Sequence, residues 1–554
     1  MDGRAQRGRG ATIVETALVF VIAALVRWPG IAQELGGDEL YNFLAARQLL
    51  VDGTLSIHGG DPYTRAELFT RIVAGFFRLF GESSAVARLP ALLFGAAAAA
   101  IVFWWVASHG ERLAAWVAAL LLAFDPEAVK ASQMCRFYTM HMVLFLGAAV
   151  AVEAAVRPGR RIGSALAFAA GAVLALRVGT EIQPVTKIGA GGLALFAGLA
   201  CLPRVLAVMR SGRMAQLAVG AAVLGVLGVV ALWAGHGGLD ELIRLATYRD
   251  LWARGAAERP DFYVQALIEA YPTFATLLPV LVLLAAPRQP MLTLLCVCVF
   301  GASLVVHSAM AWKAQRYVLY LQPFFFVLSG LAVAAVVPAL VQATDRFLLP
   351  HRWLAERPSS TRLVRAAVLA GVALFALAAN PALARTVKSW TLDPSYRHPG
   401  MTTGTLSWAR AAGALQPVLR EAGAVVATDD LKSLYYLGRL DYVVNLDHLH
   451  EDRMPGQGPW AEFTPDAKLD VPVVSTSDSL RRIFACYAEG VVVAQHWALA
   501  TDTVVPPETA KFLETCCESI ELPREWGIAV WRWRTPASEL ARDCPPGPPH
   551  AVDP

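Results

Sequence analysis

The sequence is poor in charged residues, which make up 17% of its 554 positions, whereas hydrophobic residues make up 56%. Soluble domains hold about 25% charged and about 45 to 50% apolar residues. The composition therefore argues against an ordinary soluble protein and indicates a membrane protein. The net charge of +4 is small for this length, so it gives no reason to expect a nucleic-acid partner.

Several common signatures of chemistry are also missing. The eight cysteines form no CxxC pair, which argues against a metal cluster. Four of them lie within or beside apolar runs, where a thiol behaves as a small hydrophobe: Cys135, Cys201, Cys296 and Cys298. The others lie in a polar tail, where one or two disulfides can form if the tail is extracytoplasmic, with the pairing left open: Cys486, Cys516, Cys517 and Cys544. The tail has no glycine-rich phosphate loop and no nucleophile elbow.

The sequence instead has a series of apolar runs, several of them close to the roughly 20 residues that cross a membrane as a helix. We predict about eleven spans: 11–29, 86–108, 112–125, 137–156, 162–178, 184–208, 215–235, 263–286, 290–308, 315–340 and 362–380. The first follows a basic segment and lacks a cleavage site, so we interpret it as a retained signal anchor. The third is short for a span.

Lysine and arginine gather in alternate loops. The basic positions are the N-terminus, 157–161, 210–213, 288 and 346–365. The positive-inside rule assigns these loops to the cytoplasm. The acidic loop 30–85 and the C-terminal tail are then extracytoplasmic, and the chain is a multi-pass protein of the plasma (inner) membrane.

We therefore predict an α-helical polytopic membrane protein with a C-terminal extracytoplasmic α/β domain. Residues 1–384 form the transmembrane domain with a catalytic first loop at 30–85, 385–540 form the soluble α/β domain, and the proline-rich 541–554 are disordered. The tail alternates strand-like runs (424–427, 442–444, 491–494, 528–533) with helix-like runs (430–437, 479–487, 507–516).

Two adjacent carboxylates, Asp38 and Glu39, are the leading catalytic candidates. They follow two glycines and open a predicted helix directly after the first span. The unpaired N–H groups of a first helical turn favour carboxylates, so Asp38 can stay ionised beside a second acid. Alternatively, both acids only cap the helix. Glu39 points about 100° away from Asp38, which allows it to hold a cation such as Arg88 or Arg136.

Further candidates for binding substrate or phosphate are cations and aromatic or acidic side chains assigned to the same side of the membrane. They are Arg88, Arg136, Tyr138, Lys187, Lys313, Arg316, Tyr41, Asp61 and Tyr63. Arg88 and Arg136 open predicted spans, where a guanidinium needs a partner and a lipid phosphate is a suitable one. Each cation alone is also explained by interfacial snorkelling, and Asp61 by a turn before Pro62.

In their order and spacing, these motifs resemble the C-type glycosyltransferases of the protein O-mannosyltransferase and lipid A aminoarabinose transferase kind. The similar features are Asp38-Glu39 with Tyr41, the amphipathic stretch 68–81, Arg88-Leu89-Pro90 with Gly95, Ser132 with Arg136 and Tyr138, and Arg316-Tyr317 with Pro323. The resemblance covers roughly residues 10 to 340. The acid–lysine pair of the aminoarabinose branch has no match around Asp61, which speaks against aminoarabinose and lipid A.

The resemblance implies that a sugar moves from a polyprenyl-phosphate donor to a lipid, glycan or protein acceptor on the extracytoplasmic face. The reaction is an inverting displacement, with Asp38 as the base. It requires no cofactor, and a divalent metal has weak support because His58 is the loop's one histidine. The alternative is a transporter or flippase of lipid-linked sugars, although broken midplane helices and repeats are not evident. A membrane scaffold that presents the tail is a third possibility.

Overall fold

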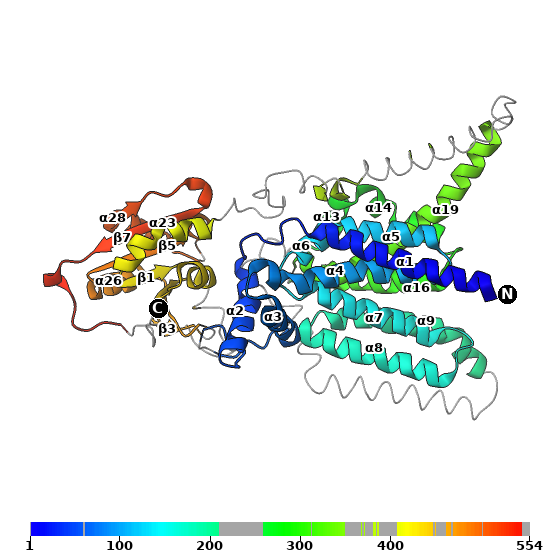
Figure 1. The fold of residues 1–554 in the computed structure, drawn as a ribbon, viewed down its shortest axis with the longest axis horizontal. Coiled ribbons are helices and arrows are strands. Elements are labelled where there is room, and N and C mark those ends of the chain that lie inside the picture. Colours follow the sequence, from blue (N-terminus) through cyan, green and yellow to red (C-terminus); the bar gives the residue numbers. More distant parts are fainter. Residues whose placement is uncertain are drawn as a thin grey trace. The chain divides into compact units, whose positions relative to one another are not determined.

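The computed structural model divides the chain into two compact units (Figure 1). The membrane unit comprises Met1–Pro29, Ala91–Gln133 and Phe137–Trp390, and the loop-and-tail unit comprises Gly30–Pro90, Met134–Arg136 and Thr391–Pro554. The residues described are 2–58, 61–209, 259–311, 313–348, 367, 371, 380–383, 385–386, 407–446, 449, 461–466, 469–500, 502 and 504–545. The predicted domain boundary near residue 385 lies next to residues outside this set, so it stays a prediction.

Seven helices within the described residues are long and apolar enough to cross a membrane. They are α1 (Asp2–Arg27), α4 (Ser84–Ala107), α7 (Tyr138–Val156), α8 (Ile162–Ile182), α9 (Thr186–Met209), the run α16 (Pro290–Cys296), η3 (Val297–Ala302) and α17 (Ser303–Ala309), and the run α18 (Gln315–Val318), η4 (Leu319–Leu321) and α19 (Gln322–Leu348). Each coincides with one of the predicted spans. The chain is therefore a multi-pass membrane protein, as its composition indicated.

The remaining predicted spans coincide with none of these seven helices. Residues 112–125 form the short apolar helix α5 (Arg112–Phe124). The prediction of one helix over 263–286 is wrong, because the segment is divided into α13 (Phe262–Ala270), α14 (Pro272–Thr276) and α15 (Leu278–Ala285). Proline lies in the first turn of both α14 and α15, where its missing N–H interrupts the preceding helix. The predicted span 215–235 and nearly all of 362–380 lie outside the described residues.

A buried arginine organises one part of the membrane unit. Arg27, at the end of α1, donates from Nε to Ser132 Oγ at 2.9 Å and from Nη1 to the carbonyl of Ala123 at 2.8 Å. Ser132 ends the short helix α6 (Pro126–Ser132). A Cβ added to Gly95 of α4 would lie 2.1 Å from Ser132 Oγ and 2.9 Å from Arg27 Nε. Glycine at 95 therefore makes room for this hydrogen bond.

The tail folds around a sheet that has seven strands within its described residues. The strands are β1 (Ala424–Ala427), β2 (Tyr442–Val444), β3 (Thr464–Pro465), β4 (Pro472–Val474), β5 (Glu489–Gln495), β6 (Glu518–Ile520) and β7 (Ile528–Arg534), in the order β3-β4-β2-β1-β5-β7-β6. The central strands β4, β2, β1 and β5 are parallel. At one edge β3 pairs antiparallel with β4, and at the other β7 pairs antiparallel with β5 and β6 antiparallel with β7. The predicted α/β fold of the tail is thus confirmed.

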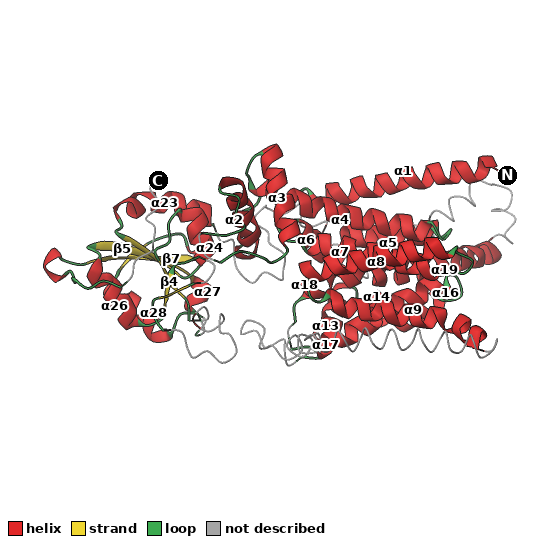
Figure 2. Ribbon diagram, turned by 90° about the horizontal axis from the view of Figure 1, so that it is seen from below, coloured by secondary structure: helices red, strands yellow, loops and turns green. Residues whose placement is uncertain are grey.

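Helices cover both faces of this sheet (Figure 2). They are α23 (Trp408–Glu421), α24 (Asp430–Lys432) with η5 (Ser433–Leu437), α26 (Ser477–Cys486), α27 (His496–Leu499) and α28 (Pro507–Cys516). Every residue of β1 is buried, as expected for a parallel strand covered on both sides. The register pairs Val425 with Val491 and Val426 with Tyr442.

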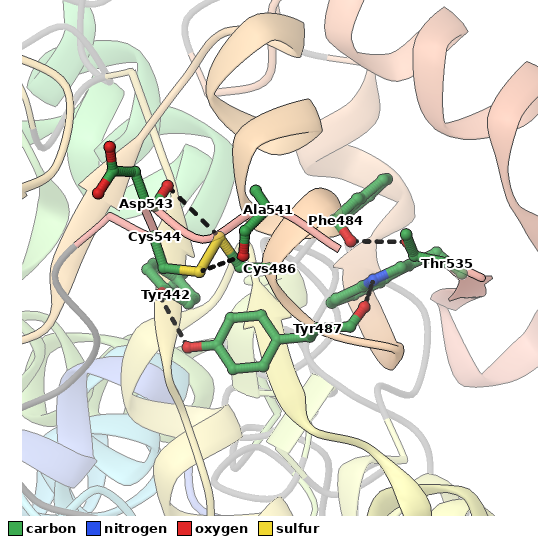
Figure 3. The surroundings of a disulfide bond; sticks show 9 residues. Tyr442, Phe484, Cys486, Tyr487, Thr535, Ala541, Asp543 and Cys544 are labelled. Atoms are coloured by element: carbon green, nitrogen blue, oxygen red, sulfur yellow. Dashed lines mark hydrogen bonds between the residues drawn. A yellow bond between two sulfur atoms is a disulfide. The ribbon is translucent and has the colours of Figure 1, made fainter. Parts of the chain in front are cut away.

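A disulfide joins Cys486, at the end of α26, to Cys544 near the end of the tail. Figure 3 shows it beside the hydroxyl pair of Tyr442 and Tyr487, which are 3.1 Å apart. Cys516 is a free, exposed cysteine. The sequence left the pairing of the tail cysteines open, and the structure pairs Cys486 with Cys544, which are 58 positions apart.

Two helices of the first loop support the candidate site. They are α2 (Gly37–Val51) and α3 (Glu67–Phe80). Asn42 Nδ2 of α2 donates to Thr70 Oγ1 of α3 at 2.9 Å, and the rings of Phe43 and Phe77 meet edge to face at 5.0 Å. The amphipathic character predicted for 68–80 is evident, because Phe69, Val73 and Phe77 are buried whereas Arg71 and Arg78 are exposed.

Candidate active site

Glu39 lies in the first turn of α2 and is 4% exposed. Its Oε2 accepts from the backbone N–H of Gly36 at 2.8 Å, so Glu39 caps its own helix, the role that was the alternative to catalysis for both acids. Its Oε1 accepts from the backbone N–H of Cys135 at 2.7 Å. Arg88 donates to both oxygens, from Nε at 2.7 Å and from Nη2 at 2.8 Å. The carboxylate is therefore fixed by four hydrogen bonds.

Arg88 is 3% exposed and forms the other half of this buried ion pair. It also donates to the backbone carbonyls of Ile31 at 2.9 Å, Gln33 at 2.6 Å and Glu34 at 2.9 Å. A guanidinium has five N–H donors, and here all five reach protein oxygens. In this arrangement Arg88 orients Glu39 and the chain before α2, and its predicted contact with phosphate stays a prediction.

Asp38 is the neighbour of Glu39 but lies on a different side of the helix and is half-buried. Its backbone carbonyl accepts from Arg136 Nη1 at 2.7 Å. The same nitrogen lies 3.1 Å from Asn42 Oδ1 and 3.4 Å from the hydroxyl of Tyr63. Arg136, which is 3% exposed, thus ties the backbone at Asp38 to the loop that carries Tyr63.

An aromatic pair borders Asp38. The rings of Tyr41 and Tyr63 stack with centroids 5.7 Å apart and planes 14° apart. Burial, followed by the negative charges of Asp430, Asp466 and Asp38, raises the pKa of Tyr41 well above its usual value. The phenol therefore keeps its proton at neutral pH, and Tyr41 can donate a hydrogen bond to an oxygen.

The structure thus brings together five predicted residues within the loop-and-tail unit. Besides Asp38 and Glu39 on α2, they are Tyr41, Tyr63 and Arg136. Arg88 joins them through Glu39. Asp61, in contrast, is an exposed residue of the same loop.

The remaining predicted residues belong to the membrane unit. Tyr138 is buried at the start of α7, and Lys187 is half-buried near the start of α9. Lys313 is buried, donates to the carbonyl of Met310 at 2.5 Å, and has a pKa lowered by burial. Arg316 is exposed and lies over the ring of Tyr317 at 5.6 Å.

The sequence did not single out the residues that the tail contributes. Asp430 and Asp466 act electrostatically on Tyr41, and Lys432 Cε lies 3.8 Å from a Cβ added to Gly37. A signal was present, because Asp429 and Asp430 follow the buried strand β1. Side chains at the carboxyl ends of parallel strands commonly form ligand sites. What the sequence lacked was any sign that this strand end meets α2.

A small, mostly apolar pocket of about 100 Å³ lies in the membrane unit. Asp125 lines it, accepts from the hydroxyl of Tyr271 at 2.6 Å, and is 1% exposed. Glu127, Glu269 and Arg385 also border it. Across the part of the chain that the structure describes, no three histidine, cysteine or acidic side chains are grouped so that they could hold a metal ion.

No protein-family model and no curated protein sequence matches the chain. Among solved structures, it is similar to those of ArnT and of an archaeal oligosaccharyltransferase. ArnT from Cupriavidus metallidurans bound to undecaprenyl phosphate matches with a TM-score of 0.58 at 16% identity, over 95% of this chain and 99% of that chain. ArnT in the apo state matches with a TM-score of 0.59 at 16% identity, over 94% and 98%.

The archaeal oligosaccharyltransferase AglB from Archaeoglobus fulgidus is also similar, in its complex with an inhibitory peptide and a dolichol-phosphate. Its TM-score is 0.52 at 13% identity, over 91% of this chain and 72% of that chain. These matches establish that the chain shares the fold of ArnT and AglB along most of its length. The fold predicted from the motifs, a helical membrane domain followed by an α/β domain, is confirmed.

Proposed function

We propose that the chain is a membrane glycosyltransferase that moves a sugar from a polyprenyl-phosphate donor to a lipid, glycan or protein acceptor. The observation that carries this proposal is the fold shared over 95% of this chain with ArnT bound to undecaprenyl phosphate. AglB, whose complex holds a dolichol-phosphate, supports the same class of donor. The half-buried acid at the start of α2 supplies the chemistry that such a transfer needs.

Asp38 acts as the base in this proposal. The acceptor oxygen forms a bond to the anomeric carbon as the bond from that carbon to the phosphate oxygen breaks, so the configuration inverts. The proton of the acceptor hydroxyl passes to the Asp38 carboxylate, and polyprenyl phosphate leaves with the bonding electrons. A carboxylate with a pKa of about 3.9 is a weak base toward an alcohol, so the positioning of the reactants carries much of the rate.

The other residues position groups or neutralise charge. Glu39 and Arg88 hold the first turn of α2, and Arg136 holds the backbone at Asp38. Tyr41 donates a hydrogen bond to an acceptor or sugar oxygen. Lys187, Lys313 and Arg316, which were predicted to bind substrate or phosphate, are the membrane unit's candidates for contact with a lipid-borne phosphate. Preorganised charges of this kind commonly supply a large part of catalysis.

We infer that the reaction takes place on the extracytoplasmic face of the inner membrane, with the tail on that side. The distribution of basic loops favours this orientation. The disulfide in the tail supports it, since disulfides persist in oxidising compartments. The proposed displacement needs no cofactor, so turnover should be unchanged by a chelator of divalent cations. A loss of turnover that Mg²⁺ or Mn²⁺ restores would show that the reaction also requires a metal ion.

The test is to incubate the purified chain with a panel of polyprenyl-phosphate sugars and candidate acceptors, and to detect products by mass spectrometry. The proposal predicts acceptor-dependent release of polyprenyl phosphate from at least one donor, with the sugar on the acceptor. A transporter or flippase would move the donor across a vesicle bilayer and leave it intact. If the donor stays intact in every combination and moves across the bilayer, the chain is a transporter or flippase and the proposal is wrong.

A further inference from the structure

The short segment that leads into α2 is held by the C-terminal tail at one backbone position. The N–H of Leu35 donates to the hydroxyl of Tyr436 at 2.7 Å, and the same hydroxyl donates to the carbonyl of Leu35 at 3.2 Å. Burial and the charge of Glu34 raise the pKa of Tyr436, so its hydroxyl keeps the proton that it donates. One phenol therefore satisfies both polar groups of a residue that is 3% exposed.

A second link joins the neighbouring residue to another element of the tail. The carboxylate of Glu34 accepts from the backbone N–H groups of Trp408 at 3.0 Å and Ala409 at 3.2 Å. These groups open α23, whose own N-cap residue, Ser407, makes no side-chain capping bond. Glu34 therefore caps a helix that lies more than 370 positions later in the chain, and a carboxylate is favoured there by the helix dipole.

An apolar contact completes the attachment. The ring of Phe43, on α2, meets the ring of Tyr435 edge to face at 5.1 Å. Phe43 is fully buried. Tyr435 and Tyr436 both belong to η5, the segment that follows strand β1 of the sheet. The tail thus contacts Leu35 and α2 through η5, and Glu34 through the first turn of α23.

These contacts lie immediately before the candidate catalytic residues. Glu34 also accepts from Arg88 through its backbone carbonyl at 2.9 Å, so the same residue connects the tail to the buried ion pair of Glu39. We propose that Tyr436 and Glu34 are positioning residues, through which the C-terminal domain fixes the first turn of α2 and thereby the direction of the Asp38 carboxylate. This inference rests on the proposed function for its effect on turnover, but its effect on structure is independent of it.

The experiment compares Tyr436→Phe with wild type and with Tyr487→Phe. Tyr487 is the matched control, because its hydroxyl pairs with Tyr442 inside the same domain. Hydrogen–deuterium exchange is measured on peptides covering 31–41 and 477–486, and kcat and KM are measured with the donor found above. Tyr436→Phe should speed exchange at 31–41 about tenfold while 477–486 is unchanged, since one hydrogen bond contributes about 0.5 to 1.5 kcal/mol.

We expect kcat to fall about two- to tenfold in Tyr436→Phe with KM for the donor unchanged, because a positioning defect acts on the reacting geometry. Glu34→Gln should give the same pattern, which guards against a folding defect peculiar to one variant. Exchange and kcat equal to wild type in both variants would overturn the inference. If exchange at 31–41 rises but even the wild-type chain releases no polyprenyl phosphate, the inference stands and the proposed function fails.

Discussion

The two sides of the first turn of α2 are built differently. On one side, the Glu39 carboxylate is buried and fixed by Arg88, Cys135 and Gly36. On the other side, Asp38 is half-buried and acts electrostatically on Tyr41, as do Asp430 and Asp466 of the tail. Adjacent acids can therefore serve separate purposes, because a rotation of about 100° per residue places them in different surroundings. Glu39 holds the framework, and Asp38 is the acid that we propose as the base.

The largest effect should follow from Asp38→Asn, which removes the base and keeps the size of the side chain. Turnover should fall by a factor of about 10² to 10⁴, the range that general base catalysis supplies. The melting temperature and the KM for the proposed donor should change little, since the buried framework is intact. Single-turnover assays with labelled donor measure the first effect. Turnover near that of wild type would show that the two acids do not differ as we propose.

Glu39→Gln tests the buried acid on the other side of this helical turn. The substitution leaves the buried Arg88 without its counter-charge, which typically costs about 3 to 5 kcal/mol of unfolding free energy. Both stability and turnover should therefore fall. The matched control is Glu67→Gln, which breaks an exposed ion pair with Arg71 and should change stability by less than about 1 kcal/mol. Equal melting temperatures for the two variants would contradict a framework role for Glu39.

The disulfide tests whether the attachment to α2 depends on the rest of the tail. Cys486→Ser with Cys544→Ser should destabilise the tail by about 2 to 4 kcal/mol, because the open chain regains its freedom when unfolded. At temperatures where the tail is still folded, exchange at 31–41 should match wild type. Cys516→Ser is the control, since this cysteine is free and exposed. Faster exchange at 31–41 in the folded double variant would show that the bond at Leu35 needs the disulfide.

The smallest effect is expected from a substitution beside Arg27, the buried arginine of the membrane unit. Gly95→Ala would push a methyl group into Ser132 and Arg27, and such overpacking costs about 1 to 3 kcal/mol. The control is Gly171→Ala, because a Cβ there meets no atom within 4 Å. Thermal unfolding in detergent measures both. A neutral Gly95→Ala would mean that the bond from Arg27 to Ser132 adjusts without loss.

Much of the fold was predictable, because hydropathy and strand patterns are local. The spans that became α4, α7 and α8 and the strands β1, β2, β5 and β7 were anticipated. The broken segment 262–285 was not, although Pro272 and Pro279 were visible in the sequence as helix interruptions. The strands β3, β4 and β6 were not anticipated: β3 has two residues, β4 begins at a proline, and β6 is largely exposed.

The candidate site was predictable only in part. Asp38 and Glu39 were found because they follow the first span and two glycines. The contributions of Tyr436, Glu34 and Asp430 were not, since they depend on contacts between residues about 400 positions apart, such as Leu35 with Tyr436. Local patterns carry no information on such pairings. The predicted pairing of Glu39 with a cation is confirmed by its ion pair with Arg88, and a buried carboxylate requires such a partner.

The most direct test of the account is the side of the membrane on which the Asp38 loop lies, because a lipid-borne donor must meet the acid there. Asp61→Cys gives an exposed handle in this loop, in a background with Cys516 and Cys517 changed to serine. A membrane-impermeant maleimide should label it in right-side-out vesicles and leave it unlabelled in sealed inside-out vesicles. Labelling only in inside-out vesicles would put Asp38 in the cytoplasm and contradict the proposed reaction.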